Sequence, residues 1–389
     1  MKIAALVRIE GDFWRRRRVL VTGHTGFKGA WLSLWLQSLG AHVTGLARGV
    51  PTQPSLYELA RVGEHMDELS VDVRDAAGVR AAVRAVRPEV VLHLAAQPLV
   101  RRSLREPALT FEVNVMGTAN VLEAVRQEGA QVRAIVAVTS DKCYENPDGG
   151  PLPDPVGDSP PEAVGGSPPD PDGGSRRFTE QDRLGGADPY SSSKACAELV
   201  AAAYRSSYFH GGQAPALASA RAGNVIGGGD WGEDRLVPDA VRAVERGELL
   251  RVRNPEAVRP WQHVLSPLAG YLLLAQALTT EGRARYARAW NFGPAAEDER
   301  TVGAVIERLR ELWDGELRWQ LDAGENPPEA ARLALDSSAA ARLLGWRAPW
   351  PLESALARIV EWHRAHRAGG DMRAVSVEQI ESTGIADFT

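Results

Sequence analysis

Short apolar runs alternate along the first half of the chain with segments in which apolar residues recur every three or four positions. The runs predict strands at residues 18–22, 42–47, 68–71, 90–94 and 133–139. The periodic segments predict helices at residues 30–39, 76–86, 109–128 and 189–209. Strands that alternate with helices indicate an α/β fold with a parallel, doubly wound sheet.

The first predicted strand runs into a glycine-rich turn, Gly23-His24-Thr25-Gly26-Phe27-Lys28-Gly29, directly before the first helix. Glycine permits a tight turn and close backbone approach to a ligand. The helix N-terminus offers unpaired N–H groups to a pyrophosphate. This strand–turn–helix setting predicts a Rossmann-type dinucleotide site. Lys28 either pairs with phosphate or is a solvated lysine at the helix start.

The residues that select the dinucleotide are less definite. No acidic residue ends the second strand, where Gly45-Leu46-Ala47-Arg48 stands instead. An arginine there can accommodate the 2′-phosphate of NADP. Asp72, after the third strand, either meets the adenine amine or caps the helix that starts near Asp75.

The pattern changes after residue 222, where short strands and loops mix with helices expected at 236–246, 267–278, 302–313 and 352–366. We therefore expect a dinucleotide-binding domain at 13–222 and a smaller mixed α/β lobe at 223–380. The lobe mainly binds substrate, and some of its segments return to the first domain. Residues 147–177 are rich in Pro, Gly, Asp and Ser and predict a flexible surface insertion.

Composition narrows the setting of the protein. The formal net charge is −5 and the pI is about 6.0, which gives no reason to expect nucleic-acid or membrane partners. No apolar run approaches the ~20 residues of a membrane span. Two cysteines are too few for a disulfide framework, and no signal peptide is evident, so we expect a cytoplasmic protein without a metal site.

The strongest candidate for chemistry is Tyr190-Ser-Ser-Ser-Lys194 at the start of a helix, downstream of Ser140-Asp141-Lys142 at a strand end. A spacing of four residues puts Tyr190 and Lys194 on one helix face. A lysine ammonium beside the phenol is expected to lower the pKa of Tyr190, which can then take a proton from a sugar hydroxyl. Ser140 is placed to hydrogen-bond the same oxygen.

These motifs resemble those of extended short-chain dehydrogenases that act on nucleotide sugars, and among them the CDP-glucose 4,6-dehydratases. The most specific matches are Ser140-Asp141-Lys142-Cys143-Tyr144 and Arg259-Pro260-Trp261-Gln262-His263. Further matching segments are residues 21–32, 93–101, 114–118, 188–194, 219–231, 253–255 and 290–294. The resemblance extends from residue 13 to about residue 380, and residues 147–177 depart from it.

The resemblance implies NAD as the cofactor, against the NADP indication from Arg48, and a homodimer or higher homo-oligomer. It implies a catalytic set of Ser140, Asp141, Lys142, Tyr190 and Lys194. The cofactor contacts it implies are Gly23, His24, Thr25, Gly26, Phe27, Lys28, Gly29, Asp72, Val73, Leu94, Ala95, Ala96, Tyr190 and Lys194. The substrate contacts it implies are Gln97, Asn224, Arg253, Arg259 and Trp261, with Asn224 and Arg259 at the diphosphate.

The implied reaction converts CDP-glucose to CDP-4-keto-6-deoxyglucose in deoxysugar biosynthesis. Oxidation at C4 acidifies the C5 proton, water is lost across C5 and C6, and hydride returns to C6. Asp141 suits the acid at the C6 hydroxyl, and Lys142 suits the base at C5. A sugar-nucleotide 4-epimerase is the alternative enzyme, but it needs no such pair. A regulator that only senses NAD(P) would be expected to lack Tyr190 and Lys194.

Overall fold

The computed structural model describes residues 8–146, 177–322, 324 and 333–388. Its centre is a seven-stranded parallel sheet in the order β11-β6-β5-β4-β1-β2-β3. The strands are β1 (Arg18–Thr22), β2 (His42–Ala47), β3 (Asp67–Ser70), β4 (Val90–His93), β5 (Ala134–Val138), β6 (Ala216–Arg221) and β11 (Ala289–Asn291). The predicted doubly wound parallel sheet is confirmed, and the strand order reverses beside β1.

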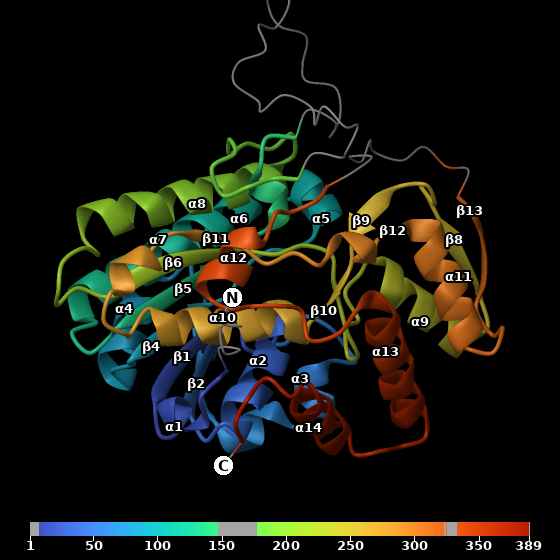
Figure 1. Ribbon diagram of the computed structural model, residues 1–389, viewed down its shortest axis with the longest axis horizontal. Coiled ribbons are helices and arrows are strands. Elements are labelled where there is room, and N and C mark those ends of the chain that lie inside the picture. Colours follow the sequence, from blue (N-terminus) through green and yellow to red (C-terminus); the bar gives the residue numbers. More distant parts are fainter. Residues whose placement is uncertain (1–7, 147–176, 323, 325–332, 389) are drawn as a thin grey trace, which may run out of the picture.

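Helices cover both faces of this sheet (Figure 1). One face packs against α2 (Phe27–Ser38) and α10 (Leu265–Ala277), and the other against α4 (Ala76–Val86), α7 (Gly117–Glu128) and α8 (Pro189–Ser207). Successive strand residues point to opposite faces, so Val19 and Val21 enter the first core cluster and Leu20 enters the second. Both faces are apolar, as a buried parallel sheet requires.

Several elements differ from the predicted boundaries. The helix expected at 109–128 consists of α6 (Pro107–Phe111), the π-helical turn η2 (Glu112–Met116) and α7. Strand β11 comes from the second half of the chain and forms the sheet edge beside β6. The insertion expected at 147–177 lies almost wholly outside the described residues.

A separate apolar cluster forms beyond the main sheet, around Trp261, Trp313 and Ile359. Its helices are α9 (Leu236–Arg246), α11 (Val302–Leu312) and α13 (Leu352–Arg367). Three two-stranded sheets lie in this part: β7 (Val225–Ile226) with β10 (Gln262–His263), β8 (Leu249–Val252) with β13 (Arg318–Leu321), and β9 (Val258–Pro260) with β12 (Glu299–Thr301). Helix α14 (Met372–Ser382) returns to pack against α2.

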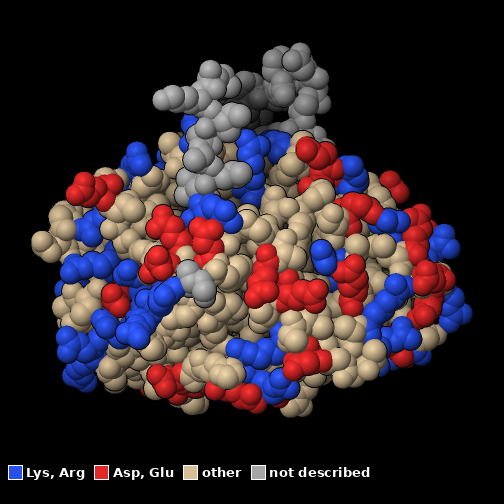
Figure 2. Space-filling view, turned by 60° about the horizontal axis from the view of Figure 1, so that its bottom comes forward, with Lys and Arg blue, Asp and Glu red and all other residues tan. Residues whose placement is uncertain are grey.

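The remaining helical elements are short: α1 (Gly11–Trp14), α3 (Leu56–Leu59), η1 (Val62–His65), α5 (Val100–Arg105), η3 (Asp141–Cys143), η5 (Arg283–Arg285), η6 (Ala296–Asp298) and α12 (Ser338–Leu343). Basic and acidic side chains are mixed over the face shown in Figure 2. Among the described helices, none is both long and apolar enough to cross a membrane. The same residues include no cluster of three His, Cys, Asp or Glu side chains suited to a metal ion.

Candidate active site

The turn between β1 and α2 has the geometry of a phosphate cradle. Gly23 has a φ of +75°, and a Cβ there would lie 2.8 Å from the Ala95 backbone. A Cβ on Gly29 would lie 2.1 Å from the Gly23 carbonyl oxygen. Helix α2 begins after Gly26 without a side-chain cap, so its first N–H groups are open to an anion. These residues fit the pyrophosphate of a dinucleotide.

His24 of this turn is engaged with the protein itself. Its Nε2 lies 2.6 Å from Glu68 Oε1 in β3, and the Tyr57 hydroxyl donates to the same oxygen at 2.6 Å. Gly45 leaves room for the imidazole, because a Cβ there would lie within 2.5 Å of the ring. Thr25 Oγ1 donates to the Gly49 carbonyl at 2.7 Å. No acidic residue stands at the end of β2. The structure shows instead a contact between His24 and Glu68 that no sequence pattern indicated.

Asp72 does not cap the following helix, and its contact with the adenine amine stays a prediction. Its carboxylate accepts hydrogen bonds from Arg74, the shortest 2.8 Å, and Arg48 Nη1 lies 3.7 Å away. The hydrogen bond from Arg74 lowers the pKa of Asp72, although burial of the carboxyl acts in the opposite direction. Asp75 caps α4 by accepting from the Gly78 N–H. Arg48 therefore partly neutralises a carboxylate at this sheet edge.

The end of β4 lies directly beside the glycine turn. Thr22 Oγ1 accepts from the N–H groups of Leu94 and Ala95, both at 3.2 Å. Ala96 continues this segment, and Val73 is buried nearby in the sheet face that α7 covers.

Gln97, predicted to contact substrate, uses its side-chain amide within the protein. The amide donates to Thr110 Oγ1 at 3.0 Å and accepts from the Leu99 N–H at 2.7 Å. Gln97 thus orders the loop after β4.

Tyr190 and Lys194 stand in the first two turns of α8. Asp188 caps this helix by accepting from the N–H groups of Tyr190 and Ser191. Ser140 interacts with the Tyr190 phenol and acts to lower its pKa, while its predicted hydrogen bond to a sugar oxygen stays a prediction. Lys194 is buried, and its Nζ donates to the Val138 carbonyl at 3.4 Å. The structure therefore brings the end of β5 and the start of α8 together.

The expected lowering of the Tyr190 pKa is wrong for the chain by itself. Burial raises the pKa of Tyr190 to about 12, although the Ser140 hydrogen bond and the charge of Arg235 oppose this. Burial and the nearby charge of Lys28 lower the pKa of Lys194 to about 8. Lys194 therefore loses its proton at a lower pH than an exposed lysine does, because desolvation disfavours its charged form.

Asp141 is buried directly beside these groups. Ser140 Oγ donates to its Oδ1 at 2.9 Å, and Asn224 Nδ2 donates to its Oδ2 at 3.5 Å. A Cβ on Gly223 would lie 1.7 Å from the carboxylate, so only glycine leaves room for it. Burial raises the pKa of Asp141, against the charge of Lys142. The direction of this shift suits a carboxylic acid that gives up a proton.

Other predicted residues occupy different surroundings. Lys142 is exposed. Burial lowers the pKa of Lys28 to about 8.

Asn224, predicted at the diphosphate, has a φ of +47° and contacts Asp141. Trp261, predicted to line the nucleotide pocket, is buried in the separate apolar cluster beyond the main sheet, where its Nε1 donates to the Arg300 carbonyl. Arg253 and Arg259 are half-buried.

Sequence reasoning missed two charged pairs around this site. Arg235 Nη1 lies 3.0 Å from Asp230 Oδ2, and the charge of Arg235 acts on both Lys28 and Tyr190. Arg221 Nη2 lies 2.8 Å from Glu198 Oε2, where both side chains are buried. No local pattern signalled the second pair, because Glu198 lies on α8 and Arg221 on β6.

The comparisons with known proteins agree with this geometry. The model of the NAD dependent epimerase/dehydratase family matches residues 19–291. The chain belongs to this family. The NAD dependence of the family agrees with the resemblance in sequence and overrides the NADP indication from Arg48.

Relatives and solved structures of this family cover nearly the whole chain. A CDP-glucose 4,6-dehydratase of Salmonella typhimurium is 46% identical over 379 residues, 96% of this chain and 97% of the relative. The UDP-glucose 4-epimerase of Thermus thermophilus, solved with NAD, is 26% identical with a TM-score of 0.70, covering 89% of this chain and 99% of that one. A dTDP-glucose 4,6-dehydratase double mutant of Streptomyces venezuelae has a TM-score of 0.71 at 24% identity, covering 92% and 99%.

Proposed function

We propose that this protein is an NAD-dependent CDP-glucose 4,6-dehydratase, a hydro-lyase that forms CDP-4-keto-6-deoxyglucose. The observation that carries the proposal is a buried carboxyl, Asp141, hydrogen-bonded to Ser140, the serine that also acts on the pKa of Tyr190. The nearly full-length similarity to a CDP-glucose 4,6-dehydratase supports the substrate. Bound NAD supplies a hydride acceptor for C4 and later a hydride donor for C6.

The residues of the chain supply the proton transfers. Tyr190 takes the proton of the C4 hydroxyl in its phenolate form, which Ser140 and the charge of Arg235 favour against burial. Asp141, whose raised pKa keeps a proton available, gives that proton to the C6 hydroxyl as water leaves. Lys142 takes the proton from C5. Gly23, Gly26 and Gly29 hold the pyrophosphate, and Lys194 binds the cofactor beside Tyr190.

A sugar-nucleotide 4-epimerase is less well supported. It shares the glycine turn and Tyr190, and several similar structures are epimerases. It has no use for an acid at C6, whereas Gly223 clears space for the Asp141 carboxylate in this chain. The arrangement around Asp141 therefore favours the dehydratase.

A panel of nucleotide sugars tests the proposal directly. Purified protein with NAD is incubated with CDP-, UDP- and dTDP-glucose, and the keto-sugar product and the net change in NADH are measured. We expect the highest kcat/KM with CDP-glucose and no net NADH, since the hydride returns to C6. Equal kcat/KM for the three substrates would overturn the nucleotide assignment. Stoichiometric NADH would overturn the dehydratase.

The role of Lys142 is tested in deuterated water. The wild type should place solvent deuterium at C5 of the product, because that proton is removed and replaced. Lys142→Met should slow this exchange by about 10²- to 10⁴-fold while C4 oxidation continues. Wild-type exchange in the variant would make Lys142 structural.

We also propose that residues 13–222 hold NAD, that residues 223–380 mainly bind the nucleotide sugar, and that the protein is cytoplasmic. The same proposal includes a homodimer through α5, α6, η2 and α8. Four large apolar side chains on these adjoining elements are exposed: Leu104, Phe111, Met116 and Leu199, the last by 58%. Such an apolar surface is typical of a homodimer interface.

Light scattering after size exclusion tests the dimer. Leu199→Glu should give a monomer, because it puts a charge into the apolar surface. Leu249→Glu is the matched control on β8 and should remain a dimer. Equal masses for the two variants would place the interface elsewhere.

A further inference from the structure

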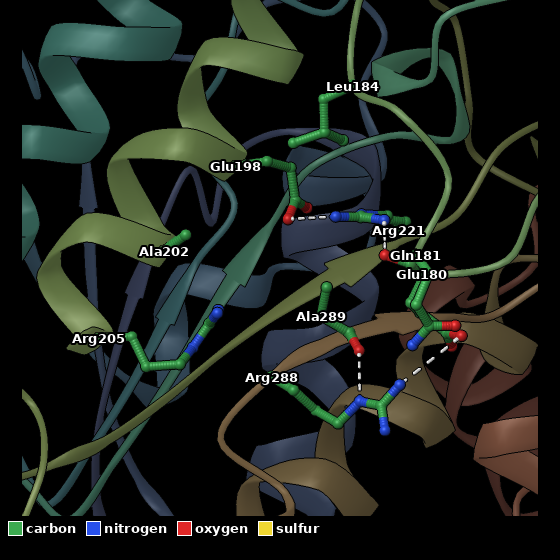
Figure 3. Close-up of a pocket in the computed structure, with 9 residues that line it drawn as sticks. All are labelled: Glu180, Gln181, Leu184, Glu198, Ala202, Arg205, Arg221, Arg288 and Ala289. Atoms are coloured by element: carbon green, nitrogen blue, oxygen red, sulfur yellow. Dashed lines mark hydrogen bonds and ion pairs between the residues drawn. The ribbon is translucent and has the colours of Figure 1, made fainter. Parts of the chain in front are cut away.

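A cavity of about 270 Å³ lies between α8 and the edge strand β11, apart from the residues assigned to catalysis. Three arginines and two glutamates line it, together with apolar residues such as Leu184. Figure 3 shows Arg205 reaching in from α8 and Arg288 from the chain before β11. Three cations against two carboxylates leave one positive charge in excess.

The carboxylate of Glu198 accepts hydrogen bonds from three side chains. It accepts from Arg221 Nη2 at 2.8 Å, from Ser219 Oγ at 2.6 Å and from Thr139 Oγ1 at 2.5 Å. Arg221 in turn donates from Nη1 to the Tyr144 hydroxyl at 2.7 Å. This pair is therefore neutral in itself, and Glu198 acts on Arg205 through its charge without a hydrogen bond to it.

Arg205 carries the excess charge. Its Nε donates to the Leu217 carbonyl at 2.9 Å, while its buried Nη2 has no hydrogen-bond partner. The Nε of Arg221, in the same wall, is also buried without a partner. A guanidinium does not lose its proton in a protein, so the excess charge stays in this wall. Arg205 is half-buried, but its buried N–H group without a partner is costly, and a bound anion that accepts from it would relieve that cost.

Arg288 adds a third, loosely held cation. Its Nη2 lies 4.0 Å from Glu180 Oε2, and its Nε reaches the Ala289 carbonyl only at 3.4 Å. Glu180 is held by the Asn291 N–H, which donates to Oε1 at 3.0 Å. The Arg288 guanidinium also lies over the Trp290 ring, 5.4 Å from the centroid, so turning toward an anion exchanges three weak contacts for a charged one.

We propose that this cavity, between Arg205 and Arg288, is a binding site for a phosphoryl group. Guanidinium groups present paired donors that match the oxygens of phosphate, and two arginines on opposite sides can hold one such group. Inorganic phosphate and the phosphoryl group of a small metabolite share this chemistry. The cavity lies on the side of α8 that faces β6 and β11 (Figure 3). Glu198, which lines the cavity, is one helical turn along α8 from Lys194.

Calorimetric titration tests the site with NAD and CDP at saturation, so that phosphate cannot bind to the catalytic site. Inorganic phosphate, glucose 1-phosphate and malonate are the probes, in a phosphate-free buffer. We expect phosphate to bind to the wild type and to Arg84→Met, a matched exposed arginine on α4. Arg205→Met should weaken phosphate binding by about 10- to 100-fold, the effect of losing a hydrogen bond to a charged group.

Further outcomes separate the sources and exclude misfolding. Tighter binding of glucose 1-phosphate identifies a metabolite, and tighter binding of phosphate identifies the free ion. Arg288→Met should also weaken binding, and both variants should keep the wild-type circular dichroism spectrum and catalytic rate. The proposal is overturned if the wild type takes up no phosphate, if Arg205→Met and Arg288→Met both bind it normally, or if malonate binds as tightly as phosphate.

Discussion

Two buried carboxylates, Asp141 after β5 and Glu198 on α8, show how surroundings assign different tasks to the same chemical group. Their exposed fractions are similar, 2% for Asp141 and 3% for Glu198. Asp141 has a serine hydroxyl and an asparagine amide as direct partners. Glu198 has two hydroxyls and the guanidinium of Arg221.

The two pKa shifts have opposite directions as a result. Burial dominates at Asp141 and raises its pKa, because no cation is directly bonded to it. Burial also acts on Glu198, but the charge and hydrogen bonds of Arg221 outweigh it and lower the pKa. Asp141 is thus suited to proton transfer, whereas Glu198 is a permanent anion that ties α8 to β5 and β6. Equal burial therefore does not imply equal function.

Asp141→Asn is expected to have the largest effect, because it removes the acidic proton while keeping the shape. Water loss should slow by about 10²- to 10⁴-fold, the usual contribution of one positioned acid. C4 oxidation should survive, so NADH absorbance and a 4-ketoglucose nucleotide should build up after mixing with CDP-glucose. Stopped-flow absorbance checks this, with Tyr190→Phe as the variant that forms no NADH. Wild-type elimination in Asp141→Asn would place the acid elsewhere.

Glu198→Gln should act on stability more than on the chemical step. It leaves Arg221 buried without its carboxylate, which costs about 3–5 kcal/mol when one partner of a buried pair is removed. Urea unfolding measures this, with the exposed Glu311→Gln on α11 as the control. Glu198→Leu combined with Arg221→Met should be more stable than Glu198→Gln, since no charge remains buried. A loss below about 1 kcal/mol in Glu198→Gln would mean that the pair is not an anchor.

The pH dependence of stability sharpens the contrast. The folded pKa of Glu198 lies below its ordinary 4.5, so its stabilisation is present above that pH and is lost on acidification. The folded pKa of Asp141 lies above its ordinary 3.8, so its contribution is favourable below that pH and declines as pH rises through the folded pKa. Asp141→Asn should therefore unfold at higher urea than the wild type at pH 7. Glu198→Gln should lose less stability than the wild type between pH 5 and pH 4. Parallel curves for all three proteins would contradict these shifts.

Thr139→Val should have the smallest effect. It removes one hydroxyl donor from Glu198 but leaves the Ser219 hydroxyl and the Arg221 guanidinium, so we expect a loss of about 1 kcal/mol. Urea unfolding beside Glu198→Gln measures the difference, and a loss as large as that of Glu198→Gln would contradict the dominance of Arg221.

The sequence by itself determined the sheet and the main motifs. The alternation of strands and helices is a local pattern, because side-chain periodicity follows from backbone geometry within each element. The glycine turn and the four-residue spacing of Tyr190 and Lys194 are local in the same way. For this reason the parallel sheet was predicted correctly and the order of the motifs led to the family.

Only the tertiary structure decided what surrounds those motifs. The space that Gly223 leaves for Asp141, the contact of His24 with Glu68 and the pairing of Arg221 with Glu198 each join residues that lie far apart along the chain. Burial likewise decided that the chain alone raises the Tyr190 pKa, contrary to the expectation from its neighbour Lys194. Desolvation and charge depend on everything packed around a group, and no short stretch of sequence contains that information.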